Sequence, residues 1–305
     1  MTFPTAVRTS DEYRHEPGLE RLWNESWYFD FASRDGAVGG YVRIGLYPNL
    51  HTAWYWACLV GADRTLVAVV DHEVPVPPGR SLEIRTSGLW ADHNCEAPLE
   101  HWSLGLEAFG VALDDPVDAY GDLRGERIAF GLDLEWETVG EVFRYPPGLD
   151  RYEVPSRVHG EVLVGAERVE IDAIGQRDHS WGVRDWWAQG WCWTAFQLDD
   201  GSMWHAVVPH DSPFSIGYVQ AEDAEPEALA YAAVAPIVGT AGIPSGASLA
   251  VGSNDFTVDP VAWAPVLLTS AEGRVSRFPR GMARFRRVDD GCEGVGWIEF
   301  NQPQE

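Results

Sequence analysis

The chain has 305 residues, a hydrophobic fraction of 45% and a formal net charge of −25 at pH 7. Its length allows one large domain or two of ordinary size, each with a buried core, and its charge disfavours nucleic acids and anionic lipid surfaces as partners. All 22 basic residues are arginine, so the sequence offers no lysine for a Schiff base, a pyridoxal phosphate anchor or a phosphate-binding loop.

Strand-like segments dominate the chain. They are short and alternating, rich in Val, Ile, Trp, Tyr and Phe, and separated by Gly, Asp or Asn turns. Helical patterns are scarce and cover only residues 11–24 and 226–233. We therefore predict an all-β protein of antiparallel strands, closed into barrels or packed as sandwiches. The predicted strands include, in chain order, SWYFDFA, GGYVRIGLY, TAWYWACLV, TLVAVVDHEV, RIAFGLDLEWE, HGEVLVGAERVEIDAI, GWCWTAFQL and SMWHAVVPH.

A proline-rich break, FRYPPGLDRYEVPSR at residues 143–157, separates two strand-rich halves of similar length. Prolines remove backbone donors and interrupt strands, so such a segment is a candidate linker. The simplest division is into two barrel domains, 1–148 and 149–305, with the charged segment RDHSWG in the second.

One stretch, GQRDHSWGVRDWW at residues 175–187, concentrates acid, base, guanidinium and indole groups. Asp178 and His179 could act as proton donor and acceptor, while Arg177 and Arg184 could hold carboxylates in a fixed geometry. The alternative is structural, because Arg–Asp bridges could equally close one end of a barrel. The local chemistry leaves both interpretations open.

A turn signal, LDDGS at residues 198–202, lies between two predicted strands. With Asp200-Gly201 as a two-residue loop, Gln197 would face Trp204 across the hairpin. Alternation then places on one face Trp191, Trp193, Ala195, Gln197, Trp204 and Ala206.

Tryptophan is concentrated in the same region: six of the 15 indoles fall within 24 residues. Core packing is the default explanation for each of them. As a group beside an acid and a base, they could also stabilise a cation formed by protonating an alkene. The six are Trp181, Trp186, Trp187, Trp191, Trp193 and Trp204.

The C-terminal stretch DGCEGVGWIEFNQP, residues 290–303, reads as a strand with Trp297 and Glu299 on one face. If that face points inward, Glu299 is a buried carboxylate and a second acid/base candidate. Otherwise it is a rim glutamate paired to an arginine.

Several other site classes lack support in the sequence. No GxGxxG opens a helix after a strand and no GxSxG is present. ADHNCEAPLEHW at residues 91–102 has no metal-ligand spacing, because consecutive strand positions point to alternating faces. We expect neither a metal nor a cofactor. The candidate ligands in this stretch are His93, Cys95, Glu96, Glu100 and His101.

No basic stretch followed by an apolar run begins the chain, and no segment resembles a membrane span. The four cysteines are far apart and form no CxxC pair, which is typical of buried thiols in a reducing compartment. We expect a cytoplasmic protein without disulfides. Whether it forms a homo-oligomer stays open.

The string GQRDHSWGVRDW, followed by GWCWTAFQLDDG, resembles the signature of the AttH and carotenoid 1,2-hydratase-like family. ESWYFDF, GGYVRIGLYPN and GVGWIEFN resemble parts of uncharacterised bacterial members, so the resemblance covers most of the chain. It implies two lipocalin-like β-barrels with an apolar pocket near their junction. Relatives include hydratases of isoprenoid double bonds and enzymes that guide pericyclic cyclisations. The positions that match the motif are Arg177, Asp178, His179, Trp181, Arg184, Asp185 and Trp186.

Our leading hypothesis is a cofactor-independent hydratase, dehydratase or isomerase. It would act on an alkene or tertiary alcohol of a hydrophobic terpenoid, steroid or polyketide-like substrate. Asp178 would donate the proton, and His179 or Asp185 would orient it or activate water. The alternatives are a carrier of an apolar small molecule and a cyclase. The substrate-binding residues would be Trp181, Trp186, Trp193, Trp204, Arg177, Arg184 and Glu299.

Overall fold

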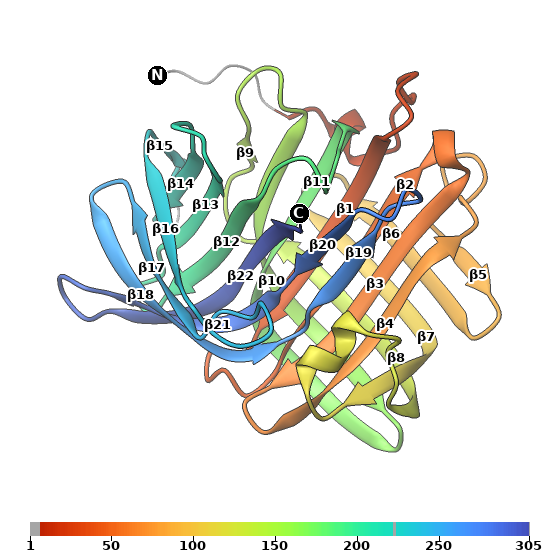
Figure 1. Ribbon diagram of the computed structural model, residues 1–305. Coiled ribbons are helices and arrows are strands. Elements are labelled where there is room, and N and C mark those ends of the chain that lie inside the picture. Colours follow the sequence, from red (N-terminus) through yellow and green to blue (C-terminus); the bar gives the residue numbers. More distant parts are fainter. Residues whose placement is uncertain (1–6, 222–223, 305) are drawn as a thin grey trace.

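The computed structural model describes residues 7–221 and 224–304, which form antiparallel strands and three short 3-10 helices (Figure 1). The all-β prediction is confirmed. The two predicted helices are wrong: residues 11–24 contain the end of one 3-10 turn and the start of β1, and residues 226–233 contribute to two strands. Strand pairing therefore overrides the local helical pattern of the second segment. The 3-10 helices are Thr9–Glu12, Pro48–Leu50 and Pro116–Tyr120.

The first sheet runs in the order β4-β3-β2-β1-β11-β10-β8-β7-β6-β5 and closes into a barrel, because β4 also pairs with β7. β9 extends it by pairing with β10. Its strands are β1 Trp23–Ala32, β2 Gly39–Tyr47, β3 Thr52–Gly61, β4 Arg64–Val74, β5 Ile84–Thr86, β6 Leu89–Ala97, β7 His101–Leu113, β8 Glu126–Thr138, β9 Phe143–Arg144, β10 Arg151–Val164 and β11 Glu167–Val183.

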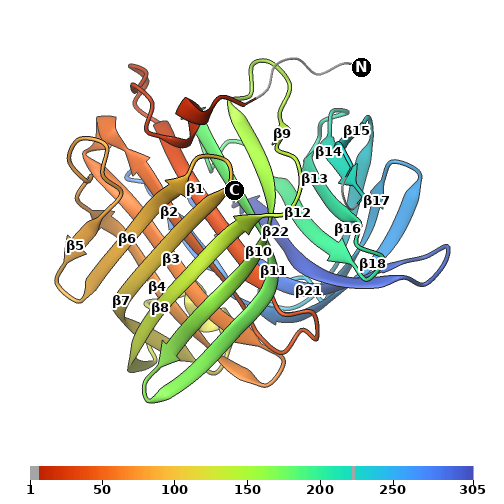
Figure 2. The same ribbon diagram turned by 180° about the vertical axis from the view of Figure 1, so that it is seen from behind.

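The second sheet runs in the order β15-β14-β13-β12-β22-β21-β18-β17-β16 and curves beside the first barrel (Figure 2). β1 and β11 lie against β22 and β12. Its strands are β12 Trp191–Leu198, β13 Met203–Pro209, β14 Ile216–Gln220, β15 Glu227–Leu229, β16 Ala232–Ile237, β17 Gly246–Val251, β18 Asn254–Trp263, β19 Val266–Thr269, β20 Val275–Phe278, β21 Arg280–Arg287 and β22 Glu293–Pro303.

The chain passes from the first sheet to the second between Val183 and Trp191. The prolines at 146 and 147 lie in a connection inside the first sheet, between β9 and β10. The predicted division between residues 148 and 149 thus does not coincide with the change of sheet. As a result, the RDHSWG segment lies on β11, in the wall of the first barrel.

Side chains pack into three main cores. One fills the first barrel and includes Trp27 and Trp136. A second joins the two sheets and includes Tyr28 and Trp193, and a third lies inside the second sheet. Because β1 and β2 are buried along both faces, they form a wall between the first two cores. The functional residues described below are held by this wall and by β11, its neighbour.

The hairpin of β12 and β13 differs from its prediction by one residue. Phe196 pairs with Trp204, and a three-residue loop at 199–201 replaces the expected two-residue loop. Gly201 has the left-handed φ of 85° that such a loop requires. A shift of one position turns a side chain to the other face of the sheet. Trp204 therefore packs with Phe196 in the third core, and the prediction that it shares a face with Trp193 is wrong.

Candidate active site between the two sheets

The charged segment of β11 sends alternate side chains to opposite faces, as strand geometry requires. Arg177 binds Glu12 (Nη1–Oε1, 2.9 Å) and His179 stacks on Trp27, both toward the interior of the first barrel. Asp178 points the other way, to the second sheet. The predicted acid and base are therefore neighbours in the sequence but do not form a pair in the fold.

Asp178 is a buried carboxyl whose Oδ2 accepts a hydrogen bond from Arg151 Nη2 at 2.7 Å. Burial raises the pKa of Asp178 to about 6; Arg151 opposes this shift, and the negative charge of Glu153 adds to it. A carboxyl with such a pKa exchanges its proton near neutral pH. This is the property required of a general acid that must be regenerated.

Glu153, next to Asp178 across the β10–β11 pair, is the centre of a hydrogen-bond network. Its Oε1 accepts from Arg151 Nε (2.7 Å), Tyr145 Oη (3.1 Å) and Trp193 Nε1 (3.2 Å). His205 lies behind Tyr145, and burial lowers its pKa to about 3, so its ring is neutral. The network therefore links the segment between β9 and β10, which carries Tyr145, to β12, which carries Trp193, and to β13, which carries His205.

A second buried carboxyl comes from the other sheet. Glu299 on β22 pairs with Arg280 on β21 (Oε2–Nη2, 2.8 Å). Burial raises the pKa of Glu299, against the charge of Arg280. The strand places Trp297 and Glu299 on the face that meets the first sheet, where Trp297 Nε1 donates to Phe31 O. The sequence left two alternatives for Glu299, a buried carboxylate or a glutamate paired to an arginine. In the structure both hold, because the side chain is buried and is also paired to Arg280.

A cleft of about 600 Å³ opens between the sheets beside this group. Arg151, which binds Asp178, lines it together with aromatic side chains from both sheets. The lining thus combines a few charged side chains with aromatic and apolar ones, as ligand pockets commonly do. The lining includes Tyr145, Arg151, Ser180, Trp181, Arg184, Asp185, Trp191 and Trp193.

Three more residues of the motif lie at or near this cleft. Arg184 donates to Ser180 Oγ (Nη2, 3.1 Å) and stacks over Trp186. Asp185 lies at the rim and pairs with Arg274 at 3.0 Å. Trp186 is fully buried, with Nε1 bonded to Tyr47 Oη at 2.7 Å, and is not part of the lining.

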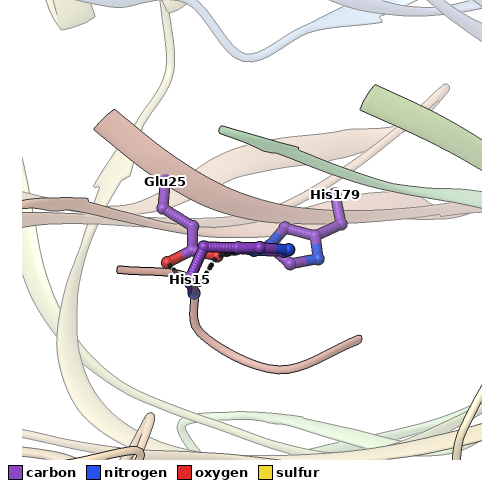
Figure 3. A group of neighbouring side chains, drawn as sticks. All are labelled: His15, Glu25 and His179. Carbon is purple, nitrogen blue, oxygen red and sulfur yellow. Dashed lines mark hydrogen bonds and ion pairs between the residues drawn. The ribbon is translucent and has the colours of Figure 1, made fainter. Parts of the chain in front are cut away.

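His179 belongs to a separate cluster inside the first barrel (Figure 3). Glu25 Oε1 lies 2.8 Å from His15 Nδ1 and 3.0 Å from His179 Nε2. Two imidazoles and a carboxylate are a donor set that divalent transition metals use. Within residues 7–221 and 224–304, this is the group of three such side chains whose ligand atoms lie close enough together to hold one metal ion. Tyr152 Oη, 3.2 Å from His179 Nδ1, orients the second ring.

The ligand candidates at residues 91–102 do not join that cluster. His93 is buried in the first barrel core beside Phe29 and Tyr55, and His101 pairs with Glu135 at the surface. His101 lies on the next strand, β7, and alternation along β6 turns the neighbouring positions Cys95 and Glu96 to opposite sides.

A second cleft, of about 880 Å³, lies at the far end of the first barrel. Its acidic lining side chains, such as Asp63 and Asp114, are exposed and solvated.

Within the described part of the chain, no helix has the length and apolar character needed to cross a membrane.

Sequence reasoning missed Tyr145, Arg151 and Glu153, because the prolines around them suggested a linker. A signal was available: RYE at residues 151–153 alternates charged and aromatic residues as a strand does. It also missed Arg43 and Arg280, which lie in strands remote from the motif.

Solved structures with the same fold include an AttH-like protein from Nitrosomonas europaea (TM-score 0.69, 15% identity, 97% of each chain covered). They also include kievitone hydratase from Nectria haematococca (TM-score 0.59, 14% identity, 97% of this chain and 93% of that one). A third is CghA bound to Sch210972 (TM-score 0.58, 12% identity, 93% and 89%). At these identities the likeness establishes the lipocalin-like double-barrel fold, which the sequence resemblance had implied, and one of these proteins is a hydratase.

No curated protein matches the sequence. A family model does match, over residues 8–304, which is nearly the whole chain. The chain therefore belongs to the family of the domain of unknown function DUF7064.

Proposed function

We propose that the protein is a cofactor-independent hydratase, dehydratase or isomerase. Its substrate would be an alkene or tertiary alcohol of a hydrophobic terpenoid, steroid or polyketide-like compound. The observation that carries the proposal is Asp178, a buried carboxyl with a pKa of about 6 that lies directly behind Arg151, its hydrogen-bond partner, in the lining of an aromatic cleft. A hydratase, kievitone hydratase, has the same fold.

In the forward direction, the carboxyl of Asp178 protonates one carbon of the alkene and leaves a cation on the other. The indoles of Trp191 and Trp193 line the cleft and can stabilise that charge without attacking it, whereas the indole of Trp181 stacks on His15. Water then adds to the cation and returns a proton to the carboxylate. Dehydration is the reverse sequence, and loss of a proton from a neighbouring carbon gives an isomer.

The remaining residues support this step. Arg151 fixes the orientation of Asp178, and Arg184 sits at the cleft wall. Glu299, whose pKa is also raised by burial, is a second carboxyl that can hold a proton. Asp185 lies at the rim, where it can order water. We assign no chemical role to His179, because its ring is engaged by Glu25 and Tyr152 on the other side of β11.

The test is an incubation of the purified full chain, dialysed against EDTA, with a panel of unsaturated isoprenoids, sterols and their tertiary alcohols. Products are compared by mass and retention time between wild type, Asp178→Asn and Asp172→Asn. Asp172 is the matched control: it lies on the same strand in an Arg–Asp pair, with Arg157 at 3.1 Å, but its side chain is 75% exposed. Turnover should survive in Asp172→Asn and disappear in Asp178→Asn.

Two outcomes contradict the proposal. A fully active Asp178→Asn enzyme would remove the proposed acid. Binding of the panel compounds with unchanged mass and retention time, identical in all three proteins, would indicate a carrier.

A further inference from the structure

Two arginines buried between the sheets keep side-chain nitrogens without a hydrogen-bond partner in the described part of the chain. They are Arg43, at Nη1 and Nη2, and Arg280, at Nε and Nη1; their exposed fractions are 3% and 1%. Arg43 stacks over Trp56 (4.5 Å) and Arg280 over Tyr41 (3.8 Å), and these rings offer attraction but no acceptor oxygen. Leaving a charged donor buried and unpaired is costly, so such atoms call for a partner.

The sequence makes room for the first of these arginines. Gly45 lies two positions along β2 from Arg43, on the same face, and a Cβ there would overlap Arg43 Nη1. Tyr47, close enough to affect the pKa of Arg43, is already engaged by Trp186 Nε1 at 2.7 Å. The guanidinium is therefore held in place without an anion of its own.

The charges around Asp178 do not balance. Four guanidinium groups interact there: Arg43, Arg151, Arg184 and Arg280. They face the carboxyl groups of Glu153, Asp178 and Glu299. A fourth carboxyl, Asp30, accepts a hydrogen bond from Gln176 N, and burial raises its pKa well above the ordinary value, which disfavours its charged form. Even with the other three carboxyl groups ionised, the guanidinium groups outnumber them, and the excess of positive charge grows when Asp178 is protonated. This excess is buried in a chain whose net charge is −25.

The cleft reaches this excess charge at Arg184. Its guanidinium forms part of the lining and lies flat on Trp186, with Ser180 Oγ as a neutral partner. Burial and then the charge of Arg151 lower the pKa of Arg184, which is the direction for a cation short of anions. Its planar fork of donors matches a carboxylate, which it can bind through two parallel hydrogen bonds.

We propose that the cleft binds apolar molecules that carry a carboxylate or an equivalent oxyanion, with the anionic group on Arg184 and the apolar body against Trp191 and Trp193. The inference rests on the proposed function in that it takes the same cleft as the substrate site. It adds the substrate class, an unsaturated hydrophobic acid instead of a neutral hydrocarbon or alcohol.

The test uses two matched pairs of probes, retinoic acid with retinol and abietic acid with abietinol. Binding to the full chain is followed at pH 7.5 by quenching of tryptophan fluorescence. In at least one pair, the acid should bind at least about tenfold more tightly than the alcohol, as one charge-assisted pair of hydrogen bonds provides. Arg184→Gln should reduce this ratio to about threefold or less while the alcohol still binds as in wild type.

Arg277→Gln is the matched control, because Arg277 stacks over Tyr120 at 5.5 Å and donates to a neutral acceptor, Ala241 O, much as Arg184 stacks over Trp186 at 5.1 Å and donates to Ser180 Oγ, but Arg277 lies outside the cleft lining. It should leave the ratio unchanged. Arg184→Lys keeps the charge but loses the planar fork, so the ratio should fall only in part. This variant decides the matter if Arg184→Gln does not fold.

The inference is overturned if neither acid binds more tightly than its alcohol, or if both Arg184 variants keep the wild-type ratio. These results are separate from those on turnover. An acid preference that depends on Arg184, in a protein that is fully active as Asp178→Asn, would refute the proposed chemistry and leave the substrate class standing.

Discussion

The carboxylate of Glu25 and the imidazole of His179 face each other inside the first barrel, with Oε1 3.0 Å from Nε2. His15 completes the group from the N-terminal segment, through both its ring and its backbone N–H. Burial alone would raise the pKa of Glu25, but the hydrogen bonds from His15 and His179 hold it below its ordinary value. The cluster thus ties residues before β1 to β1 and β11.

We expect Glu25→Gln to lower the free energy of unfolding by about 2 kcal/mol at pH 7, because two histidines lose a charged acceptor. A carboxylate with a depressed pKa contributes stability above its unfolded pKa of about 4.5 and loses it as pH falls through the folded value. The difference between variant and wild type should therefore shrink below pH 4.5 in urea titrations. Glu16→Gln, an exposed neighbour, is the control; equal stability of the two variants at pH 7 would refute the role of the cluster.

The pH dependence of turnover should report the proton on Asp178. Its pKa is about 6, so the acid form is lost above that value and kcat/KM for alkene protonation should fall about tenfold per pH unit. The profile is measured from pH 5 to 9 with wild type and Asp172→Asn, which should coincide. A rate that stays flat up to pH 8 would contradict the assignment.

Arg151 should shift that profile, because it is a positioning residue that also opposes the protonation of Asp178. In Arg151→Gln the positive charge that lowers the pKa of Asp178 is lost. The pKa should therefore rise, and the alkaline limb of the profile should move to higher pH. We also expect a loss of about 3 kcal/mol of stability, because Glu153 and Asp178 are left buried without their cation. Arg151→Lys keeps the charge and should retain the wild-type profile; an unshifted limb in Arg151→Gln would argue against this coupling.

The two tryptophans of the β12–β13 hairpin should behave differently. Trp193 lines the cleft, whereas Trp204 packs on Phe196 in the third core. Trp193→Phe should weaken binding of the retinoid probes and reduce quenching, while Trp204→Phe should lower thermal stability and leave binding unchanged. Fluorescence titration and thermal melting separate the two effects. Equal effects of both variants on binding would mean that the hairpin faces have been misassigned.

Local alternation was enough to predict the strands around Trp27, Trp193 and Trp297, because these segments are apolar on at least one face. The turn at 199–201 could not be counted correctly, since a two-residue and a three-residue loop share the same Asp-Gly signal. The change of sheet was out of reach for a different reason. It depends on β10 and β11 pairing with β8 and β1, which are distant in the sequence, and no local pattern encodes that pairing.

The residues of the candidate site likewise divide into those that the sequence could predict and those that it could not. Asp178, Arg184 and Glu299 were found because unusual residue types stood in strand-like contexts. Arg43 was not found, because a single arginine in GGYVRIGLY looks like a solvent-facing position of a half-buried strand. Only the second sheet, packed over that face, buries it.

One face of β11 points into the first barrel and the other points toward the second sheet. Substitutions at neighbouring positions of this strand should therefore have different effects. Substitutions at Arg177, His179 and Trp181 act on the interior of a barrel, whereas those at Asp178 and Ser180 act on the side of β11 that faces the second sheet and the cleft. A complete mutational scan of residues 176–181 should accordingly alternate residue by residue. Abundance of folded protein would fall at one set of positions and ligand-dependent phenotype at the other, with a period of two.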